Sequence, residues 1–131
     1  MNPATRLLAI VLLAVTALPA AFAQSNYPSQ PVRMIVTTVA GGGLDNFARM
    51  LARELSARAG QQFIVDNRAG AGTTIGSAAA AKAKPDGYTI LVNTAALAIS
   101  PAIYQKLPYD TLADLAPITL AAATQIGRAH V

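Results

Sequence analysis

Three short loops carry the residue types that could bind an anion. They span residues 37–45, 67–76 and 93–100, and each is rich in glycine, alanine, serine, threonine or asparagine. Glycine lets backbone N–H groups approach a ligand closely, and hydroxyl side chains add further donors. Loops of this kind that lead into helices can hold a phosphate or a carboxylate. The spacing of the loop residues is the evidence that distinguishes a phosphate site from a carboxylate site.

The spacing disfavours a nucleotide phosphate. Gly70, Gly72 and Gly76 form G-x-G-x-x-x-G, one residue longer than the dinucleotide fingerprint. The acidic residue expected about twenty positions further on is missing, and the nearest one, Asp86, falls in a Pro-Asp-Gly-Tyr turn. The triple glycine 41–43 is not followed by the Lys and Ser or Thr of a P-loop. The neutral donors of the three loops suit a small carboxylate.

The nucleophiles, motifs and acid–base pairs that enzymes commonly use are missing from these 131 residues. The chain has no cysteine, and therefore no thiol nucleophile, disulfide or thiolate metal site. It contains no G-x-S-x-G motif, and its acidic residues form no convincing acid–base pair. Asp110 and Asp114 are four residues apart, which is typical of a solvated pair at the start of a helix. We predict no enzymatic activity, no cofactor and no metal site.

Four side chains in the loops have two interpretations each. Asp45 either stabilises the start of a helix, or orients the glycine loop or meets an ammonium or hydroxyl group of the ligand. Thr73 and Thr74 either face the ligand or cap the next helix. Arg68, the only cation in the loops, either pairs with ligand charge or forms a surface ion pair, and we favour the surface pair.

Three apolar, β-branched runs predict the strands that carry these loops. They cover residues 31–39, 62–67 and 88–94, and such runs are typical of buried parallel strands. Each is followed by a loop and then by a segment of helical character, which is the order of βαβ units. We predict an α/β fold with a parallel sheet flanked by helices, and a ligand site beyond the carboxyl ends of the strands.

The first segment between strands has the pattern of an amphipathic helix. Residues 44–59 place Phe47, Leu51 and Leu55 at four-residue spacing. This spacing assigns Phe47 to the core. Gly60 stands where a helix commonly ends in a left-handed residue.

Two further helices are expected, with a turn between them. The alanine-rich residues 77–84 predict a helix that Pro85 ends. Residues 85–88 have turn chemistry, since Pro and Gly supply the required φ values. Residues 95–107 predict a short helical stretch with Pro101 near its start.

Residues 1–23 have the pattern of a cleaved secretory signal. Arg6 supplies the positive charge, and residues 7–18 form an apolar stretch too short to span a bilayer comfortably. Residues 21–23, Ala-Phe-Ala, match the small-x-small cleavage pattern. We predict that the mature chain starts at Gln24 and is exported; an uncleaved membrane anchor is the alternative.

The charged residues argue against a nucleic-acid surface. The ten lysines and arginines exceed the six acidic residues, for a net charge of +4, and removal of Arg6 leaves nine. They are scattered singly, without a basic stripe or interleaved aromatic residues, and tryptophan is absent. Nucleic-acid-binding domains concentrate their charge on one face, so we predict no nucleic-acid partner.

The last residues of the sequence differ in character from those before them. Residues 126–131 match a translation of ATC-GGA-AGA-GCA-CAC-GTC. This run resembles a common short-read sequencing adapter, whose next codon in the same frame is a stop. We therefore expect that residues 120–131 are a truncated end and that 126–131 are foreign to the gene. Arg128 and His130, the only histidine, would then carry no function. A genomic read with gene sequence continuing across these codons would contradict this hypothesis.

Several motifs in order resemble the receptor family of tripartite tricarboxylate transporters, also called Bug proteins. They are NRAGAG, PDGYT and LPYDTLADLAPIT, and the similarity runs from Tyr27 to Thr119. The resemblance implies a type II periplasmic solute-binding protein with two α/β domains, of which residues 24–119 form an incomplete first domain. Such receptors, which we expect to be monomers when complete, capture small carboxylates for membrane transporter subunits. A receptor that signals to a sensor kinase, or an exported α/β enzyme, is the alternative.

The resemblance also implies which loop residues would bind the ligand through amides, hydroxyls and bridging water. The set is Thr38, Gly41, Gly42, Gly43, Asp45, Gly70, Ala71, Gly72, Thr73, Thr74, Thr94 and Ala95. This chain departs from the family at Thr37 and Thr38, where proline and phenylalanine are usual, and at Ala40, where proline is usual. The family's aromatic wall is therefore absent from the first loop.

Overall fold

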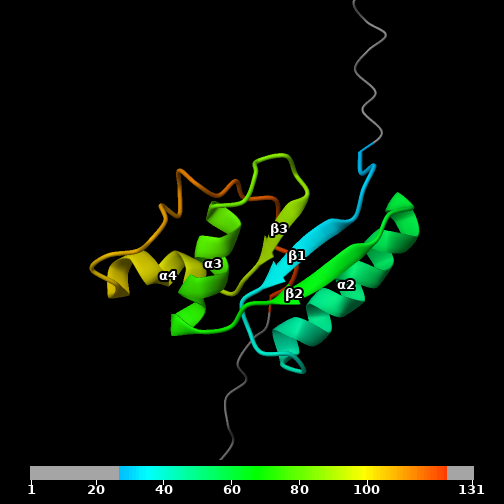
Figure 1. The fold of residues 1–131 in the computed structure, drawn as a ribbon. Coiled ribbons are helices and arrows are strands. Elements are labelled where there is room, and N and C mark those ends of the chain that lie inside the picture. Colours follow the sequence, from blue (N-terminus) through cyan, green and yellow to red (C-terminus); the bar gives the residue numbers. More distant parts are fainter. Residues whose placement is uncertain (1–26, 124–131) are drawn as a thin grey trace, which may run out of the picture.

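The structure is a computed structural model that describes residues 27–123. These residues form a three-stranded parallel sheet in the order β2-β1-β3 (Figure 1). The central strand β1 (Val32–Val36) lies between β2 (Phe63–Asn67) and β3 (Thr89–Val92). The predicted α/β class and parallel sheet are confirmed. The predicted signal segment and residues 126–131 lie outside the described residues.

The core of the molecule is the central strand. Val32, Met34, Ile35 and Val36 are completely buried, whereas Arg33 is exposed. Burial of consecutive residues is expected for a parallel strand that is covered on both faces. The strand is shorter than predicted because both neighbours end with it: Val36 is in register with the last residues of β2 and β3.

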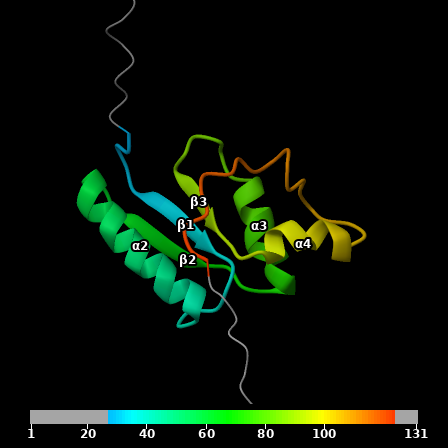
Figure 2. The same ribbon diagram turned by 180° about the vertical axis from the view of Figure 1, so that it is seen from behind.

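The helices cover the two faces of the sheet. Helix α2 (Gly43–Ala59) packs against β1 and β2, and α3 (Thr74–Ala81) packs against β1 and β3. Figures 1 and 2 show α2 on one side of the sheet, with α3 and α4 on the other. This arrangement follows from right-handed crossovers, because the chain leaves β1 for one neighbour and then crosses back to the other.

Helix α2 begins and ends close to its predicted bounds. Gly60 has φ +69° and donates its N–H to the Ser56 carbonyl at 3.1 Å, as expected for a left-handed helix end. The assignment of Phe47 to the core is wrong for the described residues, where it is only half-buried. The buried face consists instead of Asp45, Ala48 and Ala52, since small side chains allow the helix to approach the sheet closely.

Helix α3 starts three residues earlier than predicted and ends at Ala81, before the lysines. Gly76 lies inside it, where a Cβ atom would come within 2.8 Å of the Arg68 carbonyl oxygen and 2.9 Å of Thr37 Cγ2. The absence of a side chain therefore lets the helix contact the end of β1.

Helix α4 (Ala96–Ile103) differs from the prediction in the place of its proline. Pro101 is the sixth of eight residues rather than near the start. Proline has no N–H to donate to the preceding turn, so this short helix lacks one of its internal hydrogen bonds. Among the described residues, no helix is long and apolar enough to cross a membrane.

The segment 104–123 contains neither helix nor strand. Asp110 accepts hydrogen bonds from the N–H groups of Leu112 and Ala113, at 2.8 and 2.9 Å, while Asp114 accepts one from Asp110 N–H at 2.8 Å. The two backbone donors, Ala113 first, lower the pKa of Asp110. The predicted helix start at this acidic pair is therefore wrong, since the two residues close a turn.

Candidate functional site

All three predicted loops leave the sheet at the same edge. Parallel strands place their carboxyl ends together, and hydrogen bonds join the segments that follow them. The Asn67 amide donates to the Thr38 carbonyl at 3.1 Å, and the Thr37 hydroxyl donates to Asn93 Oδ1 at 2.9 Å. The structure thus brings the loops together as the sequence predicts (Figure 1).

The first loop is held by a buried carboxylate. Asp45 Oδ2 accepts hydrogen bonds from the Gly41 N–H at 2.8 Å and from Arg49 Nε at 2.9 Å, and Oδ1 accepts one from Asn67 Nδ2 at 2.9 Å. The Arg49 bond first, then those from Gly41 and Asn67, lower the Asp45 pKa to about 2. The contact with Gly41 supports the interpretation that Asp45 orients the loop. Its place in the first turn of α2 also suits the helix dipole.

The glycines of this loop leave room beside the start of α2. Gly41 adopts a left-handed φ of +83°, and a Cβ atom at Gly41 or Gly43 would meet nothing within 4 Å. At Gly42 a Cβ atom would lie 3.3 Å from the Val39 carbonyl oxygen. The N–H groups of the first helical turn have no acceptor within the helix, so this open edge can receive an acceptor atom of a ligand.

The second loop has an unusual backbone. Gly70, Ala71, Gly72 and Thr73 all have positive φ values, between +45° and +129°. Ala71 and Thr73 carry a strain that glycine would avoid. A Cβ atom at Gly72 would lie 2.5 Å from the Tyr104 hydroxyl oxygen. Glycine is therefore required at position 72 by both its backbone conformation and its contact with the segment after α4.

The two threonines of the second loop act within the protein. Thr74 Oγ1 donates to the Ala71 carbonyl at 2.8 Å, and the Tyr104 hydroxyl donates to the same oxygen at 3.2 Å. Thr73 occupies the N-cap position of α3 without a side-chain capping bond, and its hydroxyl accepts from Asn93 Nδ2 at 3.4 Å. The capping interpretation of this pair is therefore wrong.

The third loop begins with a residue that the sequence analysis missed. Asn93 Oδ1 accepts from the Thr37 hydroxyl and from Thr94 N–H at 2.7 Å, while Nδ2 donates to Ser77 Oγ at 3.0 Å. Ser77 is completely buried. The predicted Thr94 and Ala95 are exposed. A sequence signal for it was present, because an asparagine stands at the carboxyl end of both outer strands: Asn67 is the last residue of β2, and Asn93 directly follows β3.

Arg68, the cation of the second loop, takes no part in the hydrogen bonds that Asn93 makes with Thr37 and Ser77. Arg68 Nε contacts Asp66 Oδ2 at 3.0 Å, and the Arg68 side chain is 44% exposed. The predicted surface ion pair is confirmed. Asp86, the acidic residue weighed for a nucleotide site, accepts a hydrogen bond from Tyr88 N–H at 3.0 Å within its turn.

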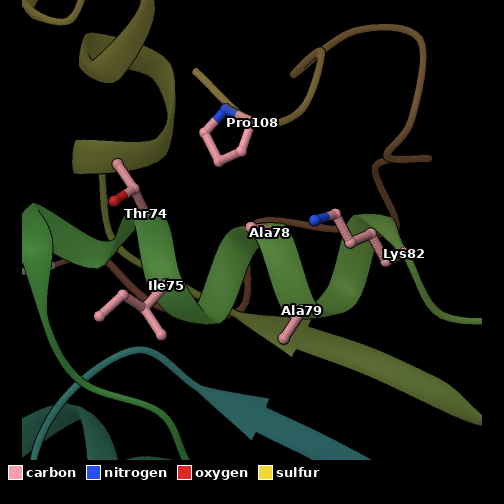
Figure 3. Close-up of a pocket in the computed structure, with 6 residues that line it drawn as sticks. All are labelled: Thr74, Ile75, Ala78, Ala79, Lys82 and Pro108. Carbon is pink, nitrogen blue, oxygen red and sulfur yellow. The ribbon is translucent and has the colours of Figure 1, made fainter. Parts of the chain in front are cut away.

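A hollow of about 340 Å³ lies on the outer side of α3. It is lined by Thr74, Ile75, Ala78, Ala79, Lys82 and Pro108. Figure 3 shows Pro108 across from the helix, along which Thr74, Ala78 and Lys82 follow one another. Thr74 is the one member of the predicted ligand set that lines it, so this hollow adjoins the second loop and extends away from it along α3.

Comparison with known proteins identifies similar receptors. The sequence model of the family described as "Tripartite tricarboxylate transporter family receptor" matches residues 47–128. A UPF0065 protein of Bordetella bronchiseptica is 50% identical over 115 residues, which are 87% of this chain and 34% of that protein. The chain thus spans about a third of the length of this relative. The family model's match includes residues 126–128, so the adapter origin of residues 126–131 stays a prediction.

Solved structures show the same fold. The periplasmic binding protein BugD aligns with a TM-score of 0.65 and 41% identity, over 67% of this chain and 29% of BugD. The Rhodopseudomonas palustris proteins Rpa4515, solved with adipate, and MatC, solved with malate, have TM-scores of 0.62 and 0.56. Their identities are 34% and 31%, over 65% and 67% of this chain and 29% and 30% of theirs. The chain belongs to the tripartite tricarboxylate transporter receptor family, and its described residues form part of a periplasmic-binding-protein domain.

Proposed function

We propose that this protein is a periplasmic receptor that binds a small carboxylate and delivers it to the membrane subunits of a tripartite transporter. Family membership and the adipate and malate bound to structural relatives support this function. The signalling and enzymatic alternatives gain no such support. We further propose that the complete protein acts as a monomer, after removal of residues 1–23.

The observation that carries the proposal is the chemistry of the loop edge. The three loops offer backbone N–H groups and hydroxyls, and their one cation, Arg68, is paired with Asp66. Neutral donors and a helix N-terminus can stabilise a carboxylate without an opposing charge. Open space beside Gly41 and Gly43 gives such a ligand access to the first turn of α2.

The twelve residues implied by the resemblance remain our proposed ligand set, and the geometry supports different roles within it. Gly41 and Gly43 border open space, and Gly42 lies between them beside the Val39 carbonyl. Asp45 is buried and directs its oxygens to protein donors, so it supports the loop. Thr74 donates its hydroxyl to the second loop's own carbonyl, which shapes that loop.

Isothermal titration of the protein expressed from the complete gene tests the function. Adipate, malate and citrate are the probes, and the diamides of adipate and malate are matched uncharged controls. We expect saturable binding of at least one acid, with a Kd of about micromolar or tighter, and none of its diamide. Absence of binding to every acid, or equal binding of acid and amide, would contradict the proposal.

A further inference from the structure

The three partners of Asp45 come from different parts of the site. Gly41 belongs to the first loop, Arg49 lies one turn further along α2, and Asn67 ends β2. Arg49 also donates to Asn67 Oδ1 at 3.1 Å, and Asn67 donates to the Thr38 carbonyl at 3.1 Å. These bonds form a closed ring that ties together the end of β1, the glycine loop and the start of α2.

Because Asp45 is buried, its carboxylate needs the hydrogen bonds of this ring. The residue is 1% exposed, and a buried carboxylate is costly unless it is paired and hydrogen-bonded. Both of its oxygens are used by protein donors. A ligand would therefore meet the loop that Asp45 holds rather than the carboxylate itself.

The bond to Gly41 determines which N–H groups remain for a ligand. Gly41 is in the left-handed region, and its N–H points to Asp45. Gly43 and Leu44 follow as the first helical residues, whose N–H groups have no acceptor within the helix. Fixing Gly41 thus sets the direction in which the next amides are presented.

We propose that Asp45 is a positioning residue for ligand binding: it anchors the Gly41 N–H so that the first turn of α2 presents its free amides to the ligand carboxylate. This inference rests on the proposed carboxylate-binding function. Arg49 and Asn67 keep Asp45 in place, and the Asp45 carboxylate acts through the loop rather than by contact with the ligand.

The direction in which a substitution at Asp45 changes ligand affinity distinguishes a positioning role from an effect of its charge. A carboxylate near an anion site repels the ligand, so removal of its charge alone should tighten anion binding. Loss of positioning should weaken it. Asp45→Asn preserves the shape but replaces one acceptor oxygen by an NH₂ group, which cannot accept from a donor. The variant therefore gives opposite results under the two explanations.

The experiment is a titration of malate and adipate into the protein from the complete gene, at low salt and neutral pH. We expect D45N to weaken binding of the acid that the wild type takes by roughly tenfold or more, as the loss of a charged hydrogen bond predicts. Asp66→Asn is the matched control, because it removes the same charge from an exposed surface pair near Asn67. We expect less than about a twofold change for D66N.

A second measurement tests the mechanism. The amide resonance of Gly41 should move in D45N, and those of Gly43 and Leu44 with it, while melting temperatures show that the protein is folded during titration. If D45N does not fold, Asn67→Ala is judged by the same criteria, because it removes three hydrogen bonds of the ring and leaves Asp45 charged.

The outcomes separate this inference from the proposed function. Weaker binding by a folded variant, with displaced Gly41–Leu44 resonances, supports positioning. Binding that equals or exceeds that of D66N overturns the inference alone. A wild-type protein that binds neither these acids nor citrate contradicts the proposed function and the inference with it.

Discussion

Two adjacent threonines at the end of β1 have different environments. The Thr37 hydroxyl donates to Asn93 Oδ1, whereas Thr38 Oγ1 is buried without a hydrogen-bond partner among the described residues. A buried polar atom is stabilising when it is paired and costly when it is not. The two positions therefore offer a matched pair of substitutions.

We predict that Thr37→Val lowers the free energy of unfolding by about 1 kcal/mol, because it removes a donor to Asn93. Thr38→Val should be neutral or stabilising, because it removes an unpaired buried hydroxyl. Urea denaturation of the protein from the complete gene measures both. A larger loss in Thr38→Val than in Thr37→Val would show that this description of the two hydroxyls is wrong.

The stability of the protein should depend on Asp45 in acid. Its hydrogen bonds lower the folded-state pKa from 3.8 to about 2. Above about pH 4 the carboxylate is charged in both the folded and unfolded states, and its stabilising effect is complete. That effect is lost as the pH falls from about 4 through about 2, where the folded state also takes up the proton.

The urea midpoint of the wild type should therefore fall more steeply below about pH 4 than that of Asp45→Asn, which has no proton to bind there. Asp110, whose pKa is also lowered, contributes in the same direction to both proteins and cancels in the comparison. Parallel curves for wild type and variant would mean that the ring does not stabilise the charged form.

At the scale of elements, the contact of α3 with β1 depends on a glycine in a helix. Alanine is a better helix former than glycine, by roughly 1 kcal/mol in an exposed helix interior. At Gly76 the new methyl group would come within 2.9 Å of two atoms, one of them a backbone oxygen. Packing should therefore outweigh helix propensity at this position.

We predict that Gly76→Ala destabilises the protein by about 1–3 kcal/mol through overpacking. Gly43→Ala is the control, since it lies in the first turn of α2 and its Cβ would meet nothing within 4 Å. We expect that variant to be neutral or slightly stabilising in the same thermal or urea measurements. A Gly76→Ala protein as stable as wild type would contradict the close contact with β1.

At the scale of the whole molecule, the described residues present only part of a receptor surface. Neither β2 nor β3 has a second strand neighbour among the described residues. Several large apolar side chains are well exposed, including Leu112, Ile118 and Leu120. Large exposed apolar surfaces favour association with other molecules.

We predict that residues 24–131 alone bind carboxylates poorly, because the family resemblance implies a second α/β domain, which we expect to supply the other half of the ligand site. A titration of this segment with malate, adipate, citrate or aspartate should show no saturable binding, while the product of the complete gene binds. A Kd in the nanomolar-to-micromolar range for residues 24–131 would contradict this expectation.

The order of apolar runs and glycine-rich loops was enough to predict the parallel sheet, the three loops and their common edge. The reason is local: β-branched runs favour strands, and glycine after a strand marks a turn. The end of α2 at Gly60 and the Arg68 ion pair depend on neighbouring residues, and both were predicted for that reason.

Only the tertiary structure decided which side chains support the loops. Asn67 and Asn93 are far from Asp45 and Ser77 in the sequence, and the parallel pairing of strands brings them together. The tertiary contacts also made Phe47 half-buried, buried the carboxylate of Asp45, and placed Pro101 late in α4. Local patterns determine which segments become strands and loops, but the partners of a polar side chain depend on what the fold places beside it.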